Sequence, residues 1–307
     1  MSFDSIHKKK PARLFTGDTI GIIAPSSPFD KPKFRKGLSV LEEIGFTVFF
    51  PENIFEQKGY LAGSDAHRAK MLNSMFIDSA VKGIFCARGG YGALRILPLI
   101  DYDSISLNPK LFIGCSDITV LLNTFYSKCG LVSLHGPMIE SLAEASDQTK
   151  QSLHDMLLKE QALTIVCENR VVIHSGLASG IMAGGNLTTL CHLVGTPFEP
   201  NFSDQILLLE DIGESPYRID RLLIHMKMAG CFDHIAGLVL GSFKGCGEPD
   251  VVYQVFDDIF SNDCFPILAG FDIGHDEPNL TIPFGITASL DTANGKISYG
   301  EFSFCDS

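Results

Sequence analysis

Positive charge is scarce in this sequence. The chain has 24 Lys and Arg residues against 36 Asp and Glu residues, which gives a formal net charge of −12. A surface of that sign repels phosphate backbones, so the composition argues against a nucleic-acid partner. The one basic run, residues 7–10, is short, and terminal runs of this kind are typically solvated.

A long apolar segment is also missing. The longest stretch without charge, residues 171–198, contains five glycines, two histidines and a proline. Such a stretch makes a poor membrane helix, and it predicts buried strands and turns instead. The basic run near the N-terminus is followed by Pro11, Arg13 and Asp18 and not by an apolar segment, so no export signal is expected. We therefore expect a cytoplasmic protein with no membrane partner.

None of the nine cysteines forms a CxxC pair. The spacings of the common structural metal sites are therefore absent, and we expect neither a metal nor another cofactor. Most of the cysteines stand in apolar surroundings, as Cys86 does. This pattern predicts buried free thiols in a reducing compartment.

The first half of the chain alternates strand-like and helix-like segments. Apolar runs predict strands, and apolar residues at helical spacing predict helices, one of them with Ser64 as its N-cap. The expected strands are residues 18–24, 46–50, 81–86 and 111–114, and the expected helices are residues 33–44, 64–78 and 117–128. This rhythm predicts an α/β domain in which helices flank a parallel sheet.

The second half of the chain is richer in strands. We expect strands at residues 163–173, 176–182, 206–210 and 235–240, helices at 219–229 and 251–260, and a final hairpin within 286–304 that turns at Asn294-Gly295. The fold class is therefore α/β with a smaller β-rich C-terminal domain. The expected division is an N-terminal domain at 1–150, a connector at 151–180 and a C-terminal domain at 181–307.

The strongest local signal surrounds Ser116. An apolar strand ends at Gly114 and a helix begins near Asp117, so Ser116 lies at a sharp strand-to-helix turn, as hydrolase nucleophiles do. Glycine two residues before the nucleophile relieves crowding in such a turn. The position two residues after it is Ile118, where the hydrolase motif has glycine. A helix N-cap is the alternative role for Ser116.

Residues 87–92, Ala-Arg-Gly-Gly-Tyr-Gly, follow another expected strand, and we call them the glycine loop. A dinucleotide-binding motif would require glycine at position 95, which is Arg95. The loop can instead present backbone amides to an oxyanion. A tight turn without a ligand is the alternative.

Two further candidates lie in the second half of the chain. Glu210 follows four apolar strand residues directly, and His275 lies in a loop rich in glycine and proline. A loop histidine can move a proton near neutral pH, and a carboxylate can orient it. The alternatives are an acid that caps a loop and a surface histidine. Together the segments supply a nucleophile, a base, an acid and an oxyanion loop.

In combination these segments resemble the LD-carboxypeptidase family of serine peptidases, which also contains the microcin C immunity peptidases. The likeness runs from about Asp18 to Leu290. The matching segments are residues 23–28 (IAPSSP), 87–92 (ARGGYG), 114–119 (GCSDIT), 134–138 (LHGPM), 184–187 (GGNL), 209–221 (LEDIGESPYRIDR) and 274–279 (GHDEPN).

The resemblance implies roles for individual residues. Ser116 would be the nucleophile, Glu210 the acid and His275 the general base, and the backbone amides of Gly90 and Asp117 would form the oxyanion hole. The family's usual Gly-Tyr-Ser-Asp is Gly-Cys-Ser-Asp here, so Cys115 replaces a tyrosine, which bears on the shape of the pocket.

The resemblance also implies a function. Family members release terminal D-alanine from murein tetrapeptides during cell-wall recycling and form homodimers, so a small peptide is the expected substrate. Arg88 is a candidate for binding its carboxylate, with a surface ion pair as the alternative role. A second reading is an immunity amidase that cuts an acyl-sulfamoyl-adenylate; that activity relies on tryptophan, which this chain lacks. A third is a non-enzymatic module that binds a sugar or peptide, against which the complete set of triad residues argues.

Overall fold

The computed structural model describes residues 7–159, 162–301 and 303–305. The chain divides into two compact units. The first is built from the described residues of Met1–Lys159, Thr281–Gly285 and Ser303–Ser307, and the second from those of Glu160–Leu280 and Ile286–Phe302.

The first unit contains a six-stranded sheet with the order β12-β5-β4-β3-β1-β2. Its strands run parallel except for β12, which pairs antiparallel with β5. The strands are β1 (Thr19–Ile23), β2 (Thr47–Phe49), β3 (Val81–Cys86), β4 (Leu111–Gly114), β5 (Ser133–His135) and β12 (Ile282–Phe284).

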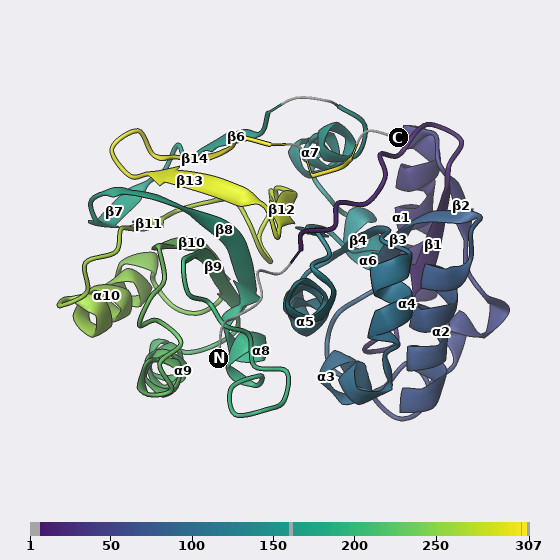
Figure 1. Ribbon diagram of the computed structural model, residues 1–307, viewed down its shortest axis with the longest axis horizontal. Coiled ribbons are helices and arrows are strands. Elements are labelled where there is room, and N and C mark those ends of the chain that lie inside the picture. The colour runs from purple at the N-terminus through teal and green to yellow at the C-terminus, as the bar shows by residue number, and fades with distance from the viewer. Residues whose placement is uncertain (1–6, 160–161, 302, 306–307) are drawn as a thin grey trace. The chain divides into compact units, whose positions relative to one another are not determined.

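Helices connect and cover these strands (Figure 1). The α-helices are α1 (Lys31–Ile44), α2 (Asp65–Ile77), α3 (Ala93–Ile96), α4 (Tyr102–Leu107), α5 (Thr119–Cys129), α6 (Ile139–Leu142) and α7 (Asp147–Leu158), and the 3-10 turns are η1 (Glu52–Phe55), η2 (Leu97–Leu99) and η3 (Ser116–Ile118). Local signals set their ends. The Ser64 side chain accepts a hydrogen bond from the His67 amide, which confirms its predicted N-cap role, and α1 ends at Gly45 with φ 107°.

The order of the strands places a switch point between β1 and β3. The chain leaves β1 in one direction to form β2 and then crosses back to form β3. Because parallel crossovers are right-handed, α1 and α2 lie on opposite faces of the sheet. The loops that follow β1 and β3 therefore diverge at the carboxyl edge of the sheet, where α/β folds bind ligands.

The second unit contains an eight-stranded mixed sheet with the order β6-β14-β13-β8-β9-β10-β11-β7. Strands β8 to β11 are parallel, and their crossovers run in one direction, so α8, α9 and α10 lie on one face (Figure 1). The elements are β6 (Thr164–Val166), β7 (Val171–His174), β8 (Leu177–Asn186), α8 (Leu187–Cys191), β9 (Gln205–Ile212), α9 (Pro216–Met228), β10 (Gly237–Lys244), α10 (Pro249–Phe260), β11 (Ile267–Ala269), β13 (Thr287–Asp291) and β14 (Lys296–Tyr299).

The structure confirms the predicted fold class, a parallel N-terminal sheet with helices followed by a β-rich domain. The compact units depart from the expected division in two places. Residues 151–180, expected as a connector, include the end of α7, all of β6 and β7 and the start of β8. Residues 281–285 and 303–305, expected in the C-terminal domain, belong to the first unit. The reason is that β12 pairs with β5, and the backbone of Cys305 forms an isolated β-bridge with that of Ala12.

Residues 171–198 form β7, β8 and α8, but they are not all buried. Val171 and Val172 are partly exposed, and Leu177 is 77% exposed. The expectation of buried strands was therefore wrong for β7 and for the start of β8. Strand β7 is exposed because it forms an edge of the sheet. Among the described residues, none of the helices combines the length and the hydrophobicity that a membrane span needs.

The cysteines all lie in the described part of the chain, and there they form no disulfide. Five are buried, as the sequence predicts: Cys86, Cys115, Cys129, Cys167 and Cys246. Burial raises the pKa of the Cys129 and Cys167 thiols to about 11, which keeps them protonated at neutral pH. Cys264 and Cys305 are exposed, so the prediction of burial does not extend to them.

Candidate active site

The turn between β4 and α5 holds Ser116 in a strained backbone conformation. Its φ is 60°, in the left-handed region that residues other than glycine seldom adopt. A Cβ at Gly114 would come within 2.7 Å of the Ile118 side chain, so glycine is needed there, as the sequence predicts. Ser116 is not the N-cap of η3 or of α5, since Cys115 and Ile118 hold those positions. The strain and the missing cap favour the nucleophile role.

The glycine loop packs directly against this turn. A Cβ at Gly89 would lie 2.9 Å from the Ser116 Cβ, so only glycine permits the approach. The Asp117 carboxylate accepts a hydrogen bond of 2.8 Å from the Ala93 amide and ties the end of the loop to the turn. Gly90 has φ 95°, and among the described residues no acceptor takes its N–H. The residue after Gly89 therefore has an amide that is available to an acceptor.

Arg88, at the start of the loop, is engaged by protein groups. Its Nε lies 3.1 Å from Glu140 Oε2, and its Nη1 donates to the Pro28 carbonyl at 2.8 Å. The side chain is 46% exposed. The structure therefore shows the ion pair that is the alternative role for Arg88.

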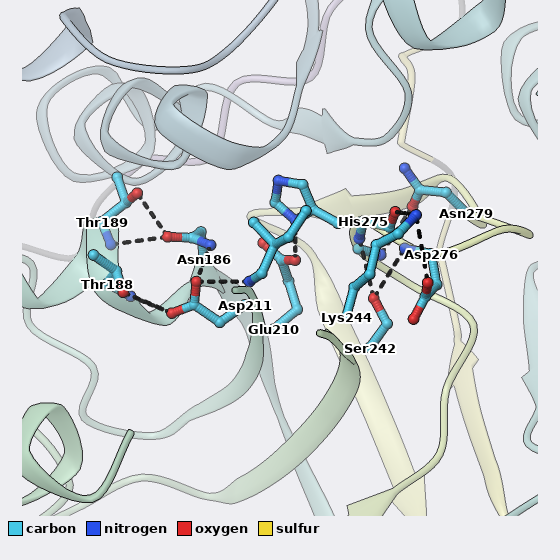
Figure 2. A network of polar contacts seen from close by, with 12 residues as sticks. Asn186, Thr188, Thr189, Glu210, Asp211, Ser242, Lys244, His275, Asp276 and Asn279 are labelled. Atoms are coloured by element: carbon cyan, nitrogen blue, oxygen red, sulfur yellow. Dashed lines mark hydrogen bonds and ion pairs between the residues drawn. The ribbon is translucent and has the colours of Figure 1, made fainter. Parts of the chain in front are cut away.

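In the second unit, polar side chains gather at the carboxyl ends of β8, β9 and β10 and in the loop after β11 (Figure 2). Asn186 at the end of β8 is directly opposite Glu210 of β9. Parallel neighbours bring their carboxyl ends to one edge, so residues far apart in the sequence meet there. The side chains at this edge include Asn186, Glu210, Asp211, Ser242, Lys244 and His275.

Glu210 and His275 form a close pair within this group. His275 Nδ1 lies 2.5 Å from Glu210 Oε2, and Glu210 is fully buried. Since an ionised carboxylate only accepts hydrogen bonds, Nδ1 carries the proton and Nε2, on the other side of the ring (Figure 2), is left as the base. A Cβ at Gly274 would come within 2.7 Å of Glu210 Oε2, so this glycine allows the loop to approach the carboxylate.

Each member of the pair changes the protonation of the other. Burial raises the pKa of Glu210 above its usual value, although the hydrogen bond from His275 opposes that rise. Burial lowers the pKa of His275, but the hydrogen bond and charge of Glu210 outweigh it, so the pKa of His275 is raised. The contact makes the two groups titrate as a unit, in which the carboxylate stabilises the imidazolium.

Other residues of this edge hold the pair and its loop in place. The Ser242 hydroxyl accepts hydrogen bonds from the backbone amides of His275 and Asp276, at 3.0 and 3.2 Å. Lys244 Nζ donates to the His275 carbonyl at 3.1 Å. Ser242 and Lys244 carry no signal in the sequence, because only the pairing of β10 with its neighbours places them here.

Asp211 organises the adjacent side of the same edge. It is 2% exposed, and its carboxylate accepts from Asn186 Nδ2 at 2.9 Å and from the Thr188 amide and hydroxyl. Asn186 in turn caps α8 by accepting from the Thr189 amide at 3.0 Å. Both residues lie in segments that carry the family resemblance, which is the signal that could have identified them.

The described residues hold no group of three His, Cys, Asp or Glu side chains arranged to bind a metal ion. What they hold is two separate groups of the residues that the sequence singles out. Ser116, Gly90 and Asp117 lie together in the first unit, and Glu210 and His275 lie together in the second. These are the parts that acyl transfer from a peptide to a serine requires.

Comparison with known proteins gives two family matches in chain order. Residues 20–136 match the LD-carboxypeptidase N-terminal domain, and residues 179–290 match the LD-carboxypeptidase C-terminal domain. The chain is 40% identical over 294 residues to the "Probable murein peptide carboxypeptidase" of Bacillus subtilis, covering 92% of each protein.

Two other similar proteins carry different names. The chain is 30% identical over 332 residues to the microcin C7 self-immunity protein MccF of Escherichia coli, and the match covers 96% of each protein. The structure also resembles the solved wild-type MccF, with a TM-score of 0.90 and 29% identity over 97% of this chain and 100% of that one. Against the crystal structure of muramoyltetrapeptide carboxypeptidase from Oxalobacter formigenes the TM-score is 0.83, with 29% identity over 92% of this chain and 99% of that one.

Proposed function

The chain belongs to the LD-carboxypeptidase family of serine hydrolases, and on that premise we propose that it releases terminal D-alanine from murein tetrapeptides. The observation that carries the proposal is the histidine held through Nδ1 by a buried carboxylate, in a chain whose strained Ser116 lies against a glycine loop. The names of two similar proteins, a murein peptide carboxypeptidase and a muramoyltetrapeptide carboxypeptidase, support the choice of substrate.

In the proposed reaction Ser116 Oγ attacks the carbonyl carbon before the terminal D-alanine while His275 Nε2 takes the hydroxyl proton. The carbonyl oxygen becomes an oxyanion, to which the amides of Gly90 and Asp117 donate. The C–N bond then breaks, and His275 gives its proton to the departing amine. Water then attacks the acyl carbon while His275 takes its proton; the ester bond to Ser116 Oγ breaks, and His275 returns the proton to Oγ. Glu210 stabilises the imidazolium at both stages.

The terminal carboxylate of the substrate needs a cation or amide donors. Arg88 remains our candidate, because it directly precedes the glycines of the glycine loop. It would exchange the carboxylate of Glu140 for that of the substrate, and the partial exposure of Arg88, 46%, makes this exchange inexpensive in free energy.

We place the protein in the cytoplasm, in cell-wall recycling and as a homodimer, in line with the family resemblance. Its cysteines support the location, because thiols that form no disulfide suit a reducing compartment. Size-exclusion chromatography with light scattering tests the dimer, and a monomer at micromolar concentration would contradict it.

Cleavage of an acyl-sulfamoyl-adenylate is the second candidate function. The likeness to MccF in sequence and structure favours it. The absence of tryptophan argues against it, because the chain cannot stack an indole on adenine.

The experiment that separates the two candidates offers each substrate to the purified protein and follows the products by mass spectrometry. We expect the tetrapeptide to lose one alanine, the adenylate to stay intact, and Ser116→Ala to abolish the loss. Cleavage of the adenylate with no release of alanine would reverse the assignment.

A further inference from the structure

Arg68 is a fully buried cation that the reaction described above does not use. It lies in the first turns of α2 and is 1% exposed. Its Nη1 donates to two backbone carbonyls, that of Pro25 and, at 2.7 Å, that of Gly92. Its Nη2 pairs with the Asp65 carboxylate. The guanidinium therefore joins α2 to two loops that follow different strands.

One of those loops is the glycine loop, which packs against Ser116, and the other is bonded to it. Pro25 begins the turn after β1, residues 25–28, which we call the serine turn, and Gly92 ends the glycine loop after β3. Ser27 joins them a second time: its amide donates to the Gly89 carbonyl at 3.2 Å, and its hydroxyl accepts from the Tyr91 amide at 3.0 Å. Gly90, the proposed oxyanion donor, is thus flanked on both sides by residues bonded to Ser27.

The backbone is shaped to admit the Arg68 side chain. Gly92 has φ 134°, and a Cβ there would lie 2.8 Å from Arg68 Nη1. A residue with a side chain at this position would therefore displace the guanidinium or the loop. The close approach is part of the local structure and does not depend on a flexible surface contact.

Stability alone is a poor explanation for this arginine. Burying a charge carries a large desolvation penalty, and one polar atom of the guanidinium, Nε, is buried without a partner. Asp65, the carboxylate with which it pairs, is shared with Arg95. Proteins tolerate such costs chiefly where function requires a fixed geometry.

We infer that Arg68 is a positioning residue for catalysis: by holding the Pro25 and Gly92 carbonyls it keeps the glycine loop in the conformation that aims the Gly90 amide at the oxyanion. It touches no substrate. Its loss would leave substrate binding largely intact and would weaken stabilisation of the transition state, because the amide would have to be ordered during the reaction. The inference rests on the proposed serine mechanism.

The test compares Arg68→Met with Arg95→Met. Both variants remove one arginine partner of Asp65, but the Arg95 side chain is 42% exposed and donates its hydrogen bonds to Asp65. Alanine release from a murein tetrapeptide gives kcat and KM. In parallel, a fluorophosphonate probe reports on the serine itself: Ser116 Oγ bonds to phosphorus, fluoride leaves, and the hydroxyl proton passes to His275.

We expect Arg68→Met to lower kcat and the labelling rate by at least about tenfold, less than the 10²–10³ typical for loss of an oxyanion donor itself. KM should stay within about threefold, and Arg95→Met should stay within about twofold in every measurement. A purely structural role would instead lower the melting temperature without this split between kcat and KM.

A folded Arg68→Met protein that labels within about twofold of the parent rate would overturn the inference, as would a loss of kcat/KM carried by KM. If Arg68→Met does not fold, Gly92→Ala replaces it in the test, because a Cβ at that position disturbs the same contact with Arg68 Nη1. The same changes in kcat, KM and labelling rate are then expected of Gly92→Ala. The probe also separates two failures: if the parent releases no alanine, the proposed function fails, yet the labelling rates still test Arg68.

Discussion

Replacing Glu210 with glutamine tests the pairing on which the proposed mechanism depends. The side chain keeps its shape, but an amide replaces the buried carboxylate that lies 2.5 Å from His275 Nδ1. A neutral partner stabilises the imidazolium less. The glutamine NH₂ can also donate to Nδ1, which would move the ring proton to Nε2 and remove the base.

The structure allows the size of the effect to be worked out. A hydrogen bond to a charged group contributes about 1.5–3 kcal/mol, which is about 10- to 150-fold in rate at 1.36 kcal/mol per tenfold. The wrong tautomer adds to this loss, and the corresponding change in a serine protease costs about 10⁴ in kcat. We therefore expect kcat to fall by about 10²–10⁴ in Glu210→Gln.

The pH dependence gives a second readout with a definite sign. His275 must be neutral to act as base, so activity rises with pH through its pKa, which Glu210 raises. Without the carboxylate that pKa falls, and the acidic limb of kcat/KM should move to lower pH while the plateau drops.

The assay is alanine release from a murein tetrapeptide between about pH 5 and 9, the range in which a histidine titrates. The control is Asp263→Asn, the same kind of change at an ion pair with Lys227, which should leave plateau and limb in place. A Glu210→Gln plateau within about threefold of the parent, with an unmoved limb, would refute the reasoning.

Three further predictions follow from the same geometry. Ser116→Ala should lower kcat by on the order of 10⁶ without unfolding the protein, and Cys115→Ala should be far milder; the opposite order in a turnover assay would make Cys115 the nucleophile. Gly274→Ala would place a Cβ 2.7 Å from Glu210 Oε2, at a backbone φ of 128°. We therefore expect kcat/KM to fall at least about tenfold and the free energy of unfolding in urea to fall by about 1–3 kcal/mol. Full activity would show that catalysis does not need the close approach of the His275 loop to Glu210. Incubation with a chelator should leave alanine release unchanged, and a loss that zinc restores would contradict the serine mechanism.

Much of the fold could be predicted from local patterns. The strand-like runs and helical spacings predict β1, α1, β3 and α2 within a few residues, and Ser64 caps α2 as expected. These features depend on neighbouring residues, so a single sequence carries them. Short elements such as α6 and β5 were missed, because three or four residues show no clear period.

The candidate residues could be named from the sequence, but their neighbours could not. Ser116 is marked by a strand, a glycine and a helix within a few residues, and Glu210 by the strand before it. The role of Arg88 was left open by sequence, because an ion pair with Glu140, 52 positions away, depends on which loops meet. Arg68 looks like an ordinary helix residue until its two carbonyl partners are seen.

The sequence by itself determined the α/β class, the family and the strand-to-helix turn at Ser116, because each is encoded in short segments and their order. Only the tertiary structure decided that His275 meets a carboxylate 65 positions earlier, that β12 returns to the first sheet, and that Arg68 joins two loops. Those contacts depend on strand register and on the order of strands in each sheet, and residues distant in the chain become neighbours only when the sheets form.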